Sequence, residues 1–103
     1  MPNVLFIHDN LGLQAWVADA LAREGFAVIP AKTPMDALRL LARLRSPVDL
    51  LIAPANDVGR LANALRQSQG YLRIISVTPE AEMMEAAEWV RAARRSFSMA
   101  AHA

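Results

Sequence analysis

The strongest constraint on the fold is a set of four short apolar runs. They lack the alternation of apolar and polar residues that is typical of a strand with one solvent-exposed face. They occupy Val4 to Ile7, Phe26 to Pro30, Asp49 to Ala53 and Arg73 to Val77. Continuous apolar runs of this length indicate strands buried on both faces. Because a helical pattern follows each run, the sequence predicts parallel strands joined by right-handed crossovers, in an open α/β layer structure.

The helical patterns predict where each helix begins, where it ends and which face it buries. Gly25 is expected to end the first helix in a left-handed conformation. Thr33 is expected to cap the second helix, with Pro34 at its first position, and Asn56 with Asp57 to cap the third. The predicted inward faces are Leu13, Trp16, Val17, Ala20 and Leu21, then Ala37, Leu38, Leu41 and Leu44, then Val58, Leu61, Ala62 and Leu65.

The composition narrows the class of protein. A length of 103 residues predicts one domain, 1–103, with a core of its own. The absence of cysteine excludes disulfides and thiolate zinc sites and favours a reducing compartment. The apolar runs are too short to span a bilayer, so a soluble, cytoplasmic protein is expected. A net charge of +1 does not indicate a surface that binds nucleic acid or membrane. The four glycines match neither the dinucleotide nor the Walker pattern, so no cofactor is expected.

The candidate site follows from the strand order. Ligands of open parallel sheets sit beyond the carboxyl ends of the strands. The first strand leads into His8, Asp9 and Asn10, the third ends at Ala53 and Pro54, and the fourth leads into Thr78. We therefore expect these six residues to surround the site.

Four fragments, in this order, resemble the receiver domain of bacterial two-component response regulators. They are "VLFIHDN", "TPMDALRLL", "DLLIAP" and "RIISVT", and the similarity covers about residues 3 to 90. The resemblance implies a flavodoxin-like open parallel sheet of about four strands, in the order 2-1-3-4, with helices on both faces. It also implies a fifth strand and a fifth helix, which are missing or atypical in this chain.

The working residues of the family are only partly present. Its first strand ends in two acids that bind magnesium, but His8 stands at the first and only Asp9 matches the second. Pro54 stands where the family has its phosphorylated aspartate, whereas Thr78 matches the switching hydroxyl. The only lysine, Lys32, lies too early in the sequence to match the family's lysine. The resemblance therefore implies a degenerate phosphorylation pocket with no metal, in which Asp9 is the one weak candidate ligand.

The last helical pattern predicts an interface. Without a fifth strand, the run from Ile74 to Val77 becomes an exposed sheet edge, which invites a covering segment or a second subunit. The helix expected from Glu80 onward carries acids in its first half and arginines in its second, which complements the helix dipole and does not indicate a nucleic-acid surface. Its apolar arc is wider than one sheet face requires, so we expect self-association, the alternative being coverage of its own edge. The candidate interface residues are Met83, Met84, Trp89, Val90 and Phe97.

Together these features predict a non-phosphorylatable receiver-like signalling domain, not an enzyme, that acts as a protein–protein interaction module. The expected partners are a second copy, giving a homodimer, and a signalling protein. Two alternatives stay open. One is a phosphoryl carrier in which His8 takes the group and Asp9 orients it. The other is a small-molecule sensor that uses the vacated pocket around His8 and Pro54.

Overall fold

The computed structural model describes residues 2–43, 47–69, 72–78 and 84–101. Strands and helices alternate along these ranges, and each strand lies within one residue of its predicted position. No helix in the described ranges is long and apolar enough to cross a membrane. The elements are β1 (Asn3–Ile7), α1 (Leu11–Arg23), β2 (Ala27–Ala31), α2 (Pro34–Arg43), β3 (Leu50–Pro54), α3 (Ala55–Gln69), β4 (Arg73–Val77) and α4 (Ala86–Ala101).

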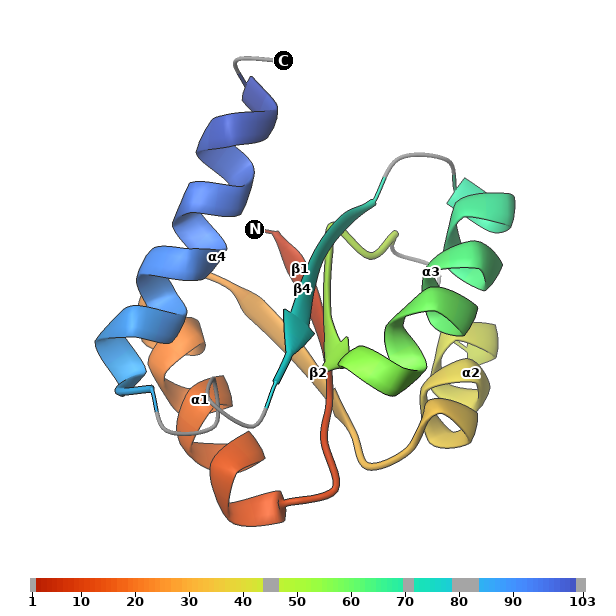
Figure 1. Ribbon diagram of the computed structural model, residues 1–103, viewed down its shortest axis with the longest axis horizontal. Helices are drawn as coiled ribbons and strands as arrows, with labels where there is room; N and C mark the ends of the chain where they lie inside the picture. Colours follow the sequence, from red (N-terminus) through yellow and green to blue (C-terminus); the bar gives the residue numbers. More distant parts are fainter. Residues whose placement is uncertain (1, 44–46, 70–71, 79–83, 102–103) are drawn as a thin grey trace.

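The strands form one parallel sheet in the order β2-β1-β3-β4, which confirms the predicted order. In the centre of the sheet, Leu5 of β1 lies opposite Ile29 of β2 and Leu51 of β3. Figure 1 shows the sheet between two helical layers, with α1 and α4 on one face and α2 and α3 on the other. The two inner strands are buried on both faces, as their continuous apolar sequences predict.

The face that a helix covers follows from the direction in which the chain crosses the sheet. The chain moves outward from β1 to β2 through α1, then back across β1 to β3 through α2, and onward to β4 through α3. Right-handed crossovers in opposite directions put their helices on opposite faces. A helix leading onward to a strand beyond β4 would lie beside α3. Helix α4 instead lies beside α1, where Arg94 donates to a carboxylate oxygen of Glu24.

Two hydrophobic cores lie on the two faces of the sheet. Val4 and Phe6 point toward α1 and α4, whereas Leu5 and Ile7 point toward α2 and α3, because successive side chains of a strand alternate between faces. Trp89 of α4 fills the first core and lies 5.8 Å from Phe6 between ring centroids. The last helix is therefore part of the folded core of the chain.

Two of the predicted inward faces are wrong in part. Trp16 leaves 46% of its surface exposed and Leu38 leaves 39% exposed. Each is the sequence neighbour of a buried residue, Val17 or Ala37, and one residue along a helix turns the side chain by about 100°. Leu44 lies outside the described residues. The remaining prediction, for α3, is confirmed by the burial of Leu61, Ala62 and Leu65 and the partial burial of Val58.

The helix termini show one wrong prediction among three. Gly25 has a φ of 92°, the left-handed conformation expected of it. Thr33 caps α2, since its Oγ1 accepts the backbone N–H of Asp36 at 3.1 Å. Asn56 and Asp57 do not cap α3. The helix begins at Ala55, directly after β3, so both residues lie in its first turn.

Candidate functional site

A pocket of about 410 Å³ opens at the carboxyl edge of the sheet, between the ends of β1, β2 and β3. Of the six residues expected there, His8, Asp9 and Pro54 line the pocket. Asn10, Ala53 and Thr78 do not line it. Thr78 follows β4 at the far side of the sheet and is exposed. The described residues that form the wall are Ile7, His8, Asp9, Lys32, Thr33, Pro34, Pro54, Asn56 and Asp57.

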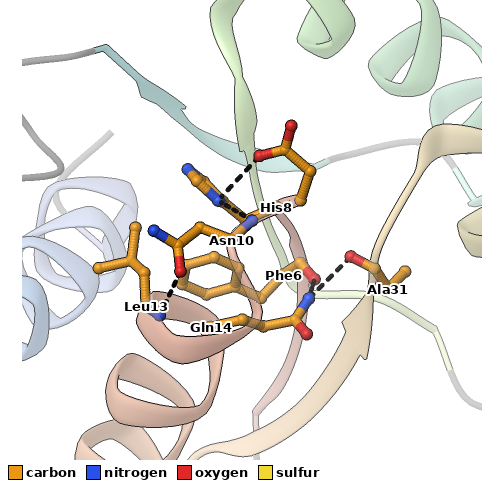
Figure 2. Close-up of polar contacts among 7 residues, drawn as sticks. Phe6, His8, Asn10, Leu13, Gln14 and Ala31 are labelled. Carbon is orange, nitrogen blue, oxygen red and sulfur yellow. Dashed lines mark hydrogen bonds and ion pairs between the residues drawn. The ribbon is translucent and has the colours of Figure 1, made fainter.

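The imidazole of His8 is held inside the loop that follows β1. Its side chain is buried, and its Nδ1 accepts the backbone N–H of Asn10 at 2.9 Å (Figure 2). The Asp9 carboxylate lies 3.6 Å from the same nitrogen, and 86% of the Asp9 side chain is exposed. His8 shapes the floor of the pocket and Asp9 stands at its rim.

Gln14 fixes the strand ends beneath this loop, a role that the sequence reading missed. Its buried Nε2 donates to the carbonyl oxygen of Ala31 at 2.8 Å and to that of Phe6 at 3.3 Å (Figure 2). The backbone N–H of His8 also donates to Ala31 O, at 3.1 Å. The signal was available, because Gln14 lies three residues before Val17 and so on the inward face of α1.

Lys32 is the least expected residue of the wall. It lies too early in the chain to match the lysine of the family, yet it reaches this pocket because the loop after β2 ends at the same edge of the sheet. The wall thus combines one amine, from Lys32, with two carboxylates, from Asp9 and Asp57. Such a wall can form ion pairs with a small ligand that carries charges of both signs.

Two features of the described wall bear on its chemistry. Pro54, the last residue of β3, has no nucleophile, and Nδ1 of His8 accepts the backbone N–H of Asn10. Across the described part of the chain, no three His, Cys, Asp or Glu side chains gather in a group that could hold a metal ion.

Four of the five expected interface residues lie in the described part of the chain, and these four pack toward its interior. Trp89 is 1% exposed and Val90 is 7% exposed. Met84 packs against the same core, and Phe97 lies 5.8 Å from Phe26 between ring centroids. Met83 lies outside the described residues. The wide apolar arc of α4 is explained by its position over both the sheet and α1, and these side chains hold the helix in place.

Comparisons with known proteins show a likeness of fold. No model of a protein family matches the chain, and no protein of curated function matches it. A response regulator from Thermotoga maritima superposes with a TM-score of 0.76 at 17% identity, over 95% of this chain and 98% of that one. The chemotaxis protein CheY4 of Vibrio cholerae gives 0.74 at 20% identity, over 93% and 98%. The non-phosphorylated HemR receiver domain of Leptospira biflexa gives 0.63 at 22% identity, over 91% and 75%.

These solved structures are response-regulator and receiver proteins, and their likeness to this chain extends over nearly its whole length. The chain therefore has the flavodoxin-like fold of receiver domains, with four parallel strands in its described part. At these levels of identity the comparison establishes the fold and leaves the chemistry to be argued from the residues of the pocket.

Proposed function

We propose that this chain is a receiver-like signalling domain that takes no phosphoryl group and acts, without catalysis, by binding protein. The observation that carries the proposal is Pro54 at the carboxyl end of β3. The resemblance in sequence assigns that position to the phosphorylated aspartate, and a proline side chain has no atom that can attack a phosphoryl donor.

The rest of the pocket supports the same reading. A receiver that is phosphorylated needs a cluster of oxygen ligands for magnesium. Here His8 replaces one acid of the pair, and its imidazole is buried with Nδ1 already accepting a hydrogen bond. Asp9 offers one exposed carboxylate. The cation of the wall, Lys32, comes from the loop after β2. The pocket keeps the location of the family's site and lacks its chemistry.

The proposed mechanism is constitutive docking in the cytoplasm. In the family, phosphorylation shifts an equilibrium between two conformations of the binding surface. A chain without an acceptor has one fixed surface, and the burial of Trp89 against Phe6 holds α4 in one position. The proposed partners are a second copy of this chain and a signalling protein. Because Trp89 and Val90 are buried, the surface that binds them lies outside these two side chains.

The test is exposure to a small-molecule phosphodonor with magnesium, followed by intact-mass spectrometry, with a receiver domain that has an acceptor aspartate as positive control. The proposal expects the control to gain a phosphoryl group and this chain to gain none. The matched variant is His8→Asp with Pro54→Asp, which restores the two missing acids. Stable labelling of the wild type would overturn the proposal, and labelling lost in His8→Ala would establish the carrier alternative.

A second candidate function, a small-molecule sensor, is favoured by the pocket itself. Its volume of about 410 Å³ and its charges of both signs suit a zwitterion of amino-acid size. Thermal denaturation with a panel of amino acids and with inorganic phosphate tests this function. A rise in Tm that Lys32→Gln abolishes would support it, and a panel without any such rise would count against it.

A further inference from the structure

The two edges of the sheet differ in their ability to accept another strand. On β2, the N–H of Ala27 donates to Pro2 O, and Ala31 O accepts the N–H of His8. In a parallel strand, the backbone N–H and C=O groups of successive residues point alternately to one neighbouring strand and to the other. The backbone groups of Val28 and Pro30 therefore point to the outer edge of β2. Pro30 is exposed and has no N–H to offer. A proline at an outward position protects an edge without costing a bond to the neighbouring strand.

The outer edge of β4 carries no such protection. The N–H of Arg73 donates to Asp49 O, so the backbone N–H and C=O groups of Arg73, Ile75 and Val77 point toward β3. The backbone groups of Ile74 and Ser76 point outward. Each of these two outward residues presents one N–H and one C=O. No strand in the described part of the chain pairs with this edge, and Ser76 is exposed.

The only charge on β4 is turned away from the edge. Sheet edges are commonly guarded by a charged side chain. The guanidinium carbon of Arg73 instead lies 4.5 Å from the centre of the Phe97 ring, on the face that α4 covers. Helix α4 also leaves the edge open, because it lies over the sheet beside α1 (Figure 1).

We propose that the outer edge of β4 pairs with the β4 edge of a second copy, in antiparallel register about a two-fold axis at Ile75. This inference rests on the proposed function, which includes self-association, and it identifies the outer edge of β4 as the surface through which two copies associate. Ile74 of each copy would lie opposite Ser76 of the other and exchange backbone hydrogen bonds, about four in all. The two Ile75 residues would form the central non-hydrogen-bonded pair, with Cα atoms about 4.5 Å apart.

The strand is complementary to itself in this register. Its outward residues, Ile74 and Ser76, are symmetric about Ile75, so every outward N–H meets a C=O. Arg73 would lie opposite Val77 of the other copy, which keeps the two positive charges at opposite ends of the pair. Ile75 is partly buried against the core beneath α4, and pairing would bury more of it against its equivalent. A two-fold pair is also closed, whereas a head-to-tail contact between identical copies generates rings or open filaments.

The first test is the solution mass by light scattering over a wide concentration range, on wild type, Ser76→Lys and Ala15→Lys. Both variants add one positive charge at an exposed position, the first on the β4 edge and the second on α1. We expect a wild-type dimer, no change in Ala15→Lys, and a folded Ser76→Lys whose dissociation constant rises at least about tenfold, equivalent to about 1.4 kcal/mol of binding.

The results separate this inference from the proposed function. A dimer that Ser76→Lys leaves intact would overturn the edge pairing and keep self-association. A wild-type monomer at every concentration would overturn both, while the absence of phosphorylation would still stand on its own labelling assay.

A second variant tests the register and does not depend on Ser76→Lys folding. The chain has no cysteine, so Ile75→Cys introduces a single thiol at the proposed axis, where paired Cα atoms fall within disulfide range. Under mild oxidation, Ile75→Cys is expected to form a covalent dimer much faster than the matched Ala15→Cys. Equal rates of cross-linking in the two variants would overturn the proposed register.

Discussion

The indole of Trp89 is the largest side chain buried in the described core, and its removal measures how firmly α4 is held on the sheet. Trp89 is 1% exposed and packs against Phe6 at 5.8 Å between ring centroids. Truncating a buried aromatic side chain costs the lost transfer free energy plus the cavity that remains, about 3–5 kcal/mol. Since a domain of this size is stable by about 5–15 kcal/mol, Trp89→Ala is expected to remove a large share of the free energy of unfolding.

Trp16→Ala is the matched control. The chain has two tryptophans, and Trp16 is 46% exposed, so its truncation is expected to cost about 1 kcal/mol or less. Urea unfolding followed by circular dichroism gives both losses from the shift in midpoint at constant slope. The Trp16→Ala variant also leaves Trp89 as the sole tryptophan, and its fluorescence should be blue-shifted until the chain unfolds.

Protein concentration distinguishes packing within one chain from packing between chains. If Trp89 packs against its own core, the stability lost in Trp89→Ala is the same at every concentration. If its contacts come from a second copy, mass action makes the loss grow with concentration. A loss below about 1 kcal/mol, matching that of Trp16→Ala, would refute the placement of α4 on the sheet.

Three further predictions concern single positions. Gln14→Leu keeps the volume and removes two donated hydrogen bonds, so it should lower the free energy of unfolding by about 1–2 kcal/mol in urea titrations, and wild-type stability would contradict the role given to Gln14. Gly25→Ala should cost about 1 kcal/mol in the same assay, because φ is 92° there while no atom lies within 4 Å of the added Cβ; an unchanged midpoint would argue against the left-handed conformation. Thr33→Ala should cost about 1 kcal/mol through loss of the cap on α2, and Thr33→Ser should retain that stability; equal losses would show that the hydroxyl is not the cause.

The strands could be predicted from sequence because burial on both faces leaves a continuous apolar run, which few other environments produce. The helices were harder. Trp16 and Trp89 both lie near the apolar stripe of their helices, and the pattern alone favoured the first as core and the second as interface. In the structure Trp89 is buried and Trp16 is exposed, because α4 packs on the sheet and α1 with the side of the helix that carries Trp89. That outcome depends on which face α4 occupies, a property of the whole chain.

The candidate site was predictable where it depends on strand ends. His8, Asp9 and Pro54 meet because β1 and β3 are neighbours, and their carboxyl ends lie at one edge. The comparison with a lysine much later in the family's sequence gives no reason to expect Lys32 at the site. Distance along the chain did not matter, because β2 also ends at this edge. Thr78 follows β4 and stands apart from the pocket.

The division of the interior into two cores has a consequence for the order in which the chain folds during synthesis. The core beneath α2 and α3 takes its side chains from residues 5–74, so it can close before the last helix has been made. The core beneath α1 needs Trp89, Val90 and Ala93. Until the ribosome has released α4, α1 alone covers this face of the sheet, and Phe6 lacks its contact with Trp89. We expect chaperones to bind the nascent chain that lacks α4. We also expect this nascent chain to aggregate when translation stalls before residue 86.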